Sequence, residues 1–256
     1  MNTQIIRKPL VDFQRGPLYP PKPLKDLRRH VMTIVLGFRC TDGVIICADQ
    51  QITSPGAFKY HQTKISIERF KSFDAVFAYA GQPGLALEVH DKIVSALRTV
   101  AIDGPVSTIV RETADSVLSN MGRLYTELEL QMLIGTTTRG QKAGLVRFDG
   151  KSVHAGSHFN YLGVGESSLI RFLAQKLYTK TIDLQVGVNL GAYLIKKAED
   201  YIDGCGGPID VLTLGDDYAL GRYSHGIVQD RIRAMEHEEA GLQDFLIRKP
   251  FSPTLP

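Results

Sequence analysis

Three residues in the first quarter of the chain have types that could do chemistry together: Thr33, Asp49 and Lys64. A threonine hydroxyl is a weak nucleophile unless a base removes its proton, and a free N-terminal amine is one of the bases that proteins use. Such an amine has an ordinary pKa of about 7.7–8.0, which suits general-base work near neutral pH. This chemistry requires Thr33 to be the first residue of the mature chain.

A buried lysine beside such a threonine would tune its reactivity. The ammonium holds the neighbouring amine neutral by like-charge repulsion and lowers the pKa of the hydroxyl. Lys64, in "YHQTKIS", is the candidate, and Asp49, at the end of "GVIICAD", could hold the lysine in an ion pair. Each residue taken singly has a plainer interpretation: Thr33 as a β-branched strand residue, Asp49 as a turn former and Lys64 as a solvated charge.

The segment before Thr33 is predicted to be a basic, proline-rich leader or propeptide. Residues 1–32 carry five prolines and little apolar periodicity, a composition that favours an extended or disordered chain. Two routes would free the Thr33 amine: cleavage after Met32, or initiation at Met32 followed by removal of the methionine, in which case the leader is not translated. Residues 33–245 are predicted to form one domain, and residues 246–256 a flexible tail.

The secondary-structure elements that must position these residues are predicted to come as groups of strands that alternate with helices. Asp42-Gly43 is a hairpin signal between two apolar, β-branched runs. Later segments alternate between helical and strand-like spacing, so that the order is strands, two helices, strands, two helices, strands and a charged helix near 229–246. Strands joined by hairpins predict antiparallel sheets. We therefore expect an α+β fold with two sheets packed face to face and helices outside both.

Composition narrows the classes of function. No run approaches 18 uncharged apolar residues, so no membrane partner is expected. The net charge is +3 and the leader alone contributes +5, which leaves a body at −2 and predicts no nucleic-acid partner. Cys40, Cys47 and Cys205 show no CxxC spacing, so we expect no metal, and reduced thiols favour a cytoplasmic protein. No GxGxxG or Walker loop is present, and no cofactor is expected.

The ordered set of motifs resembles the start of a proteasome β-type subunit or a bacterial proteasome-like peptidase. The chain has Thr33 with Gly37, then "DGVIICAD" ending at Asp49, then "TKI" with Lys64, then "YAGQPG" with Gly81. Farther on, "CGGPIDVLTL" is similar to the family's "S-G-G" followed by a strand. The resemblance covers about residues 33 to 225, and the ordered set is far more specific than any single match.

The resemblance implies a four-layer αββα Ntn-hydrolase sandwich and a threonine-type endopeptidase that forms an acyl-enzyme with peptides. Thr33 would be nucleophile through its hydroxyl and base through its amine, Lys64 would tune the amine, and Asp49 would hold Lys64. The Gly81 N–H would belong to the oxyanion hole, and Tyr79 would line the pocket for the residue before the cut bond. The implied assembly is a homo-oligomeric ring, alone or with other subunits or an ATPase, acting on peptides or unfolded proteins.

The supporting residues depart from the family pattern. Val164 replaces the serine of "G-S-G", which leaves Ser167 as the candidate for a displaced hydroxyl, and Cys205 replaces the serine of "S-G-G". Ile202 stands where an aspartate is expected, with Asp200 and Asp203 to either side, of which Asp203 is the candidate for a supporting role.

Two alternatives therefore stay open beside the peptidase. One is a catalytically silent structural subunit whose Thr33 is never exposed, and the other is an Ntn amidase acting on a small amide. Met32 stands where active family members place glycine, which disfavours self-cleavage and favours initiation at Met32.

Overall fold

The computed structural model describes residues 33–53, 59–121, 130–163 and 168–248. Their first half holds the strands β1 (Ile34–Cys40), β2 (Gly43–Asp49), β3 (Gln51–Thr53), β4 (Lys59–His61), β5 (Ile65–Arg69) and β6 (Asp74–Ala80), followed by the helices α1 (Pro83–Leu97) and α2 (Val106–Asn120). Their second half holds β7 (Gln131–Thr138), β8 (Gln141–Phe148), β9 (Val153–Ala155), β10 (Phe159–Gly163), α4 (Ser168–Leu177), α5 (Leu184–Tyr201), β11 (Ile209–Gly215), β12 (Leu220–Tyr223) and α6 (His225–Arg248).

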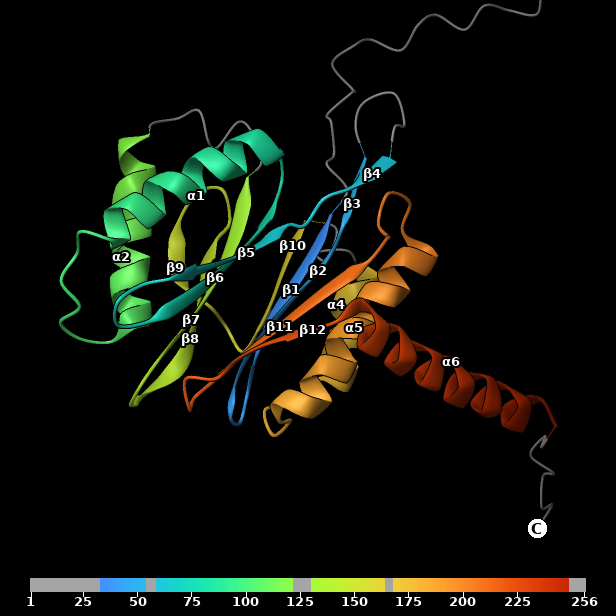
Figure 1. The fold of residues 1–256 in the computed structure, drawn as a ribbon. Coiled ribbons are helices and arrows are strands. Elements are labelled where there is room, and N and C mark those ends of the chain that lie inside the picture. The colour runs from blue at the N-terminus through green and yellow to red at the C-terminus, as the bar shows by residue number, and fades with distance from the viewer. Residues whose placement is uncertain (1–32, 54–58, 122–129, 164–167, 249–256) are drawn as a thin grey trace, which may run out of the picture.

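The strands form two five-stranded antiparallel sheets and a small ribbon. One sheet has the order β10-β1-β2-β11-β12, the other has the order β5-β6-β7-β8-β9, and β3 pairs with β4. In Figure 1, α1 and α2 cover one side of the stacked sheets, while α4, α5 and α6 lie on the other side. The predicted α+β sandwich, with helices outside two antiparallel sheets, is confirmed.

The core has three apolar layers, and β2 contributes side chains to two of them, so its sequence is apolar from Val44 to Ala48. Ile45 and Cys47 pack among the side chains of α4, α5 and α6, whereas Val44 and Ile46 pack between the two sheets. A strand covered on both faces reads as a continuous hydrophobic run rather than an alternating one. The strand brings Asp49, its only charged residue, to its end in the interior.

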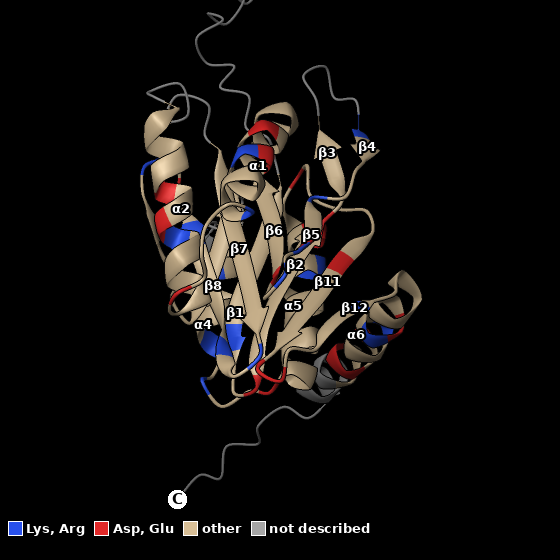
Figure 2. Ribbon diagram, turned by 60° about the vertical axis from the view of Figure 1, so that its left-hand side comes forward, with Lys and Arg blue, Asp and Glu red and all other residues tan. Residues whose placement is uncertain are grey.

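Charged residues gather mainly along the outer helices and at the ends of strands, and the strand interiors are largely uncharged (Figure 2). None of the helices in the described part of the chain combines the length and hydropathy needed to cross a lipid bilayer. All three cysteines are free and buried.

The last helix begins earlier than its charged stretch predicts. α6 starts at His225 and continues to Arg248, beyond residue 245, where the domain was expected to end. Val228 and Ile232, near its start, are buried in the core. Farther along, Glu239 accepts hydrogen bonds from Tyr193 Oη and Lys197 Nζ of α5, both at 2.6 Å. The helix is therefore attached by apolar contacts at its start and by ionic contacts in its middle.

Candidate active site

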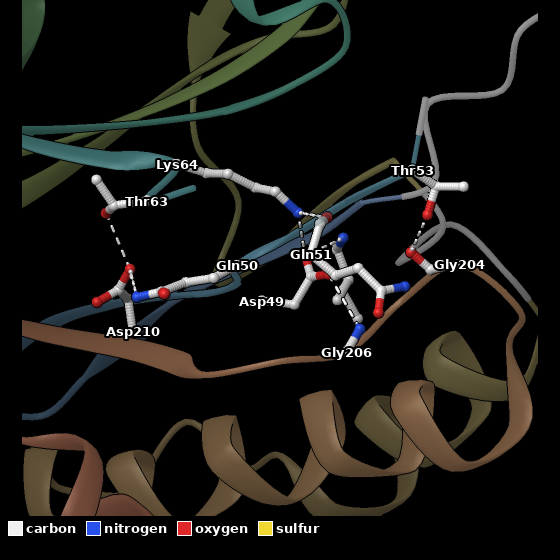
Figure 3. Close-up of polar contacts among 10 residues, drawn as sticks. Asp49, Gln50, Gln51, Thr53, Thr63, Lys64, Gly204, Gly206 and Asp210 are labelled. Atoms are coloured by element: carbon white, nitrogen blue, oxygen red, sulfur yellow. Dashed lines mark hydrogen bonds and ion pairs between the residues drawn. The ribbon is translucent and has the colours of Figure 1, made fainter. Parts of the chain in front are cut away.

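A buried ion pair lies at the end of β2. Lys64 Nζ donates to Asp49 Oδ1 at 2.7 Å, and neither side chain exposes any surface. Lys64 directly precedes β5, and its ammonium also donates to the backbone carbonyl of Gln51 at 2.6 Å (Figure 3). A charged lysine is almost never fully buried unless its charge is matched. The interpretation of Lys64 as a solvated surface charge is therefore wrong, and the predicted pairing with Asp49 is present.

Asp49 also connects this pair to the residue that follows Thr33. The Ile34 N–H donates to Asp49 Oδ1 at 3.0 Å, and the Gly206 N–H donates to Oδ2 at 3.2 Å. One carboxylate thus accepts from the start of β1, from Lys64 and from the loop after α5. These contacts bring the sequence-predicted group of Thr33, Asp49 and Lys64 together in the interior.

Burial and hydrogen bonding act against each other on this pair. Burial raises the pKa of Asp49, while the Lys64 ammonium and the N–H groups of Ile34 and Gly206 oppose that rise. Burial likewise lowers the pKa of Lys64, and the Asp49 carboxylate opposes the change. Three donors directed at one carboxylate favour its charged form. The arrangement therefore places the Lys64 ammonium in a low-dielectric site near Ile34, the first residue of β1, which directly follows Thr33.

Thr33 is buried, with 1% of its surface exposed. Its Oγ1 has no hydrogen-bond partner among the described residues. Gly163 lies directly against it, because a Cβ at Gly163 would overlap the Thr33 carbonyl oxygen, and the glycine has a φ of +63°. Glycine adopts this left-handed conformation without steric cost. Gly163 was not predicted as a site residue, although its position at the start of "GVG" was a signal.

Tyr79 lies near the end of β6, and Gly81 directly follows that strand. A Cβ on Gly163 would lie 3.2 Å from the Cβ of Ala80, so the residue before Gly81 reaches the same glycine that contacts Thr33. Gly81 itself has a φ of +127°, a conformation that favours glycine. Tyr79 packs toward α1, and its Oη is buried without a partner among the described residues. Burial raises the pKa of Tyr79 to about 12, so the hydroxyl stays neutral.

The loop between α5 and β11 carries two of the departures from the family pattern, at Ile202 and Cys205. Cys205 is buried, and burial together with the Asp49 charge raises the pKa of its thiol to about 12. Ile202 packs against the core between the sheet and α5, while Asp203 is exposed. Among the described residues, no hydrogen bond or ion pair joins Asp203 to the Asp49–Lys64 pair, and Ser167 lies outside the described residues.

Two contacts of the ion pair come from backbone groups, in Gln51 and Gly206, that were not predicted as site groups. The Gln51 carbonyl accepts from Lys64, and the Gln51 N–H donates to the Gly206 carbonyl at 2.9 Å. Gly206 has a φ of +143° and donates to Asp49. The glycine pair in "CGG" was the only sequence signal for this backbone contact.

Comparisons with known proteins identify the family of the chain. A family model described as "Proteasome subunit" matches residues 32–214, which is more than half of the chain. The chain belongs to the proteasome subunit family. No curated protein matches it.

Solved structures of Anbu proteins share the fold. The Anbu Gly-1 mutant from Hyphomicrobium sp. strain MC1 superposes with a TM-score of 0.70 at 15% identity, covering 86% of this chain and 99% of that chain. Anbu from Yersinia bercovieri, titled an ancestral beta-subunit, gives a TM-score of 0.68 at 13% identity, with coverage of 86% and 99%. The helical assembly of the Anbu complex from Pseudomonas aeruginosa gives 0.66 at 17%, with coverage of 87% and 99%.

Proposed function

We propose that this proteasome-family chain is a threonine-type endopeptidase in which Thr33 is the nucleophile. The observation that carries the proposal is the buried Asp49–Lys64 pair, whose carboxylate also accepts the amide N–H of the residue after Thr33. A fully buried lysine is costly to maintain, and buried charges with specific partners cluster at functional sites. Its position beside a threonine with an unpartnered hydroxyl matches the needs of nucleophilic catalysis.

The proposed reaction uses the freed Thr33 amine twice. The amine takes the proton of the hydroxyl as Oγ1 attacks the carbonyl carbon of the peptide bond. The C–N bond then breaks, the leaving amine receives that proton, and an ester joins the acyl group to Thr33. Water attacks the ester with the same amine as base, which releases the acid and restores the hydroxyl.

The remaining residues of the proposal have supporting roles. The Lys64 ammonium favours the neutral form of the Thr33 amine and the ionised form of its hydroxyl. The Gly81 N–H stabilises the developing oxyanion, a kind of contact whose removal costs about 10²–10³ in rate in another protease. Tyr79 lines the pocket for the residue before the cut bond. Cys205, Asp203 and Ser167 are the candidates for supporting hydrogen bonds.

Thr33 must first become an N-terminal residue, since its nitrogen is an amide in the full sequence, where it follows Met32. An amide nitrogen cannot act as a base, so the full-length chain is proposed to be inactive. Initiation at Met32 with removal of the methionine is the favoured route, and cleavage after Met32 is the other.

We further propose that the chain works as a cytoplasmic oligomer of its own copies, with peptides or unfolded proteins as substrates. The structure from Pseudomonas aeruginosa is titled a helical assembly, which supports self-association in proteins of this fold. Other subunits or an ATPase would be additional partners.

The test is covalent labelling of protein that begins at Thr33, produced by removing a cleavable fusion. An epoxyketone probe that requires both a hydroxyl and an α-amine should add one probe mass to the wild-type protein and to Thr33→Ser. Thr33→Ala, and wild type with residues 1–32 attached, should stay unlabelled. Failure to label folded, processed wild type would overturn the peptidase proposal.

That negative result would favour a silent structural subunit, because Ile202 and Cys205 replace the polar side chains that active family members are expected to carry. Labelling without turnover of peptides, but with turnover of small amides, would favour the amidase.

A further inference from the structure

A second buried carboxylate, Asp210, lies next to the candidate site without belonging to the predicted set. Asp210 is 5% exposed and sits on β11. Its Oδ2 accepts from Gln50 Nε2 and from Thr63 Oγ1, each at 2.9 Å, and its Oδ1 accepts from an Arg222 nitrogen at 3.0 Å. Both carboxylate oxygens are therefore used, and the negative charge is matched by a guanidinium.

The partners of Asp210 are the sequence neighbours of the ion pair. Gln50 directly follows Asp49, and Thr63 directly precedes Lys64 (Figure 3). On β11, Asp210 lies opposite Ala48, and Ile209 lies opposite Asp49. One side chain therefore attaches both chain segments that carry the pair to the same position on β11.

Gln50 and Thr63, which bind Asp210, flank the β3–β4 ribbon, because Gln50 precedes β3 and Thr63 follows β4. The Gln62 N–H donates to the Gln50 carbonyl at 2.9 Å and closes the base of this ribbon through the backbone. Thr63 itself is exposed, and its hydroxyl lies 3.2 Å from the Ile65 carbonyl as well as 2.9 Å from Asp210. The closer and charged acceptor makes the stronger hydrogen bond. The side-chain bridge through Asp210 is thus the contact that fixes Thr63, and with it the start of the lysine side chain.

We propose that Asp210 is a positioning residue, which acts through Thr63 and Gln50 to hold Lys64 against Asp49. Its structural consequence is independent of catalysis, and its consequence for turnover rests on the proposed peptidase function. When the bridge is lost, the Lys64 backbone is freed at the ribbon base, and the ammonium spends part of its time away from Asp49 and from Thr33.

Two substitutions at the exposed residue Thr63 test its hydrogen bond to Asp210. Thr63→Val keeps the shape of the side chain and removes the hydroxyl, whereas Thr63→Ser keeps the hydroxyl. Thr137→Val is the control for loss of a hydroxyl elsewhere in the fold, because the buried Thr137 Oγ1 donates to the Gly215 carbonyl at 2.6 Å at the far end of the sheets. Thr137→Val should weaken the fold at least as much as Thr63→Val, because it leaves a buried carbonyl without its donor, but only Thr63→Val should affect Lys64.

The first measurement is the rate at which acetic anhydride acetylates Lys64, followed by mass spectrometry of folded protein. A fully buried, paired ammonium is protected, and local opening at the ribbon base should raise its acetylation rate about tenfold in Thr63→Val. Thr63→Ser and Thr137→Val should match the wild type. Equal protection of Lys64 in all four proteins overturns the positioning role, whether or not the protein is a peptidase.

The second measurement is the pH dependence of probe labelling in chains that begin at Thr33. With the ammonium displaced, the pKa of the Thr33 amine rises toward its ordinary value, so the acidic limb of the labelling rate moves to higher pH. The maximal rate in Thr63→Val should fall about tenfold to a hundredfold, as for other small misplacements of catalytic groups. A limb that stays in place overturns the link to Thr33. Failure of wild type to label, with Lys64 exposed only in Thr63→Val, would reject the peptidase and leave Asp210 as the positioning residue of the ion pair.

Discussion

On one side of the candidate site, Asp49 and Lys64 stand at the ends of strands, and each buried charge has specific partners from neighbouring segments. On the opposite side, the loop after α5 contributes a buried thiol, Cys205, and a packed isoleucine, Ile202. The two sides meet at Gly206, whose N–H donates to Asp49. The strand side thus places two charged groups in the interior, whereas the buried side chains of the loop side are neutral and its carboxylate, Asp203, is exposed.

This difference separates two requirements of the proposed chemistry. The strand side supplies a fixed positive charge beside Thr33, which is the part that tunes a nucleophile. The buried part of the loop side supplies the Gly206 N–H and neutral side chains, which are able to position Asp49 but bring no charge to it. If the division holds, changes on the strand side should be severe, and polar changes on the loop side should be mild.

The most severe change should be Lys64→Met, which leaves the Asp49 carboxylate buried without its cation. Removal of one partner of a buried pair typically costs about 3–5 kcal/mol of unfolding free energy. Urea denaturation followed by circular dichroism measures this loss. Lys196→Met is the matched control, because Lys196 pairs with Asp200 at the same 2.7 Å but both side chains are partly exposed. The surface pair should cost less than about 1 kcal/mol, and equal losses would contradict the special status of the buried pair.

Gly163→Ala should have the next largest effect, because it acts where the strand side contacts Thr33. The added methyl group would overlap the Thr33 carbonyl oxygen in addition to straining a φ of +63°. Overpacking of a tight site typically costs about 1–3 kcal/mol. Gly140→Ala is the control, because Gly140 has a similar φ of +75° but nothing within 4 Å of its added Cβ. If the two variants lose equal stability in urea denaturation, strain alone acts at Gly163 and its contact with Thr33 is unimportant.

Cys205→Ser tests the loop side and should change little. Exchange of one neutral polar group for another in a buried position should alter the unfolding free energy by about 1 kcal/mol. Because the pKa of the thiol is about 12, neither side chain titrates near neutral pH. The acidic limb of the probe-labelling profile should therefore stay in place, whereas a moved limb would show that the loop side does influence the Thr33 amine. Folded wild type should also resist alkylation of Cys205 by iodoacetamide at pH about 8, since the thiolate is the reactive form.

The sequence predicted the strand side well because its signals are local. The hairpin at Asp42-Gly43 and the apolar run of β2 defined the strand that ends at Asp49, and the ordered motifs placed Lys64 beside it. The order of strands and helices along the chain was sufficient to predict two packed sheets with helices outside both. The neighbours within each sheet were not predictable in this way, and β10 pairs with β1 across a long separation in sequence.

The rest of the site could not be predicted, since it depends on contacts between distant segments. The attachment of Thr63 and Gln50 to Asp210 spans about 150 residues and has no spacing rule. The exposure of Asp203 beside a buried Cys205 depends on how the loop leaves α5, which side-chain types do not determine. The start of α6 at His225 was missed because the charged stretch that signals the helix begins later in the sequence.

The smallest predicted effect concerns the link between α5 and α6, far from the ion pair. Hydrogen bonds from Lys197 and Tyr193 hold the pKa of Glu239 below its usual value of 4.5. A lowered carboxyl pKa stabilises the fold above the ordinary value, and that contribution is lost as the pH falls through the lowered value. Because the Glu239 side chain is 35% exposed, solvent screens the interaction, and we expect about 0.5 kcal/mol.

Glu239→Gln should therefore lower stability slightly at pH about 7 and match the wild type near pH 3, in urea denaturation at both values. A deficit in Glu239→Gln that persists unchanged at low pH would mean that packing at this position, and not charge, attaches α6 to α5. The difference in stability loss between Glu239→Gln and Lys64→Met would then reflect how each side chain packs. The conclusion that the strand side depends on its charges would in that case be supported by Lys64→Met alone.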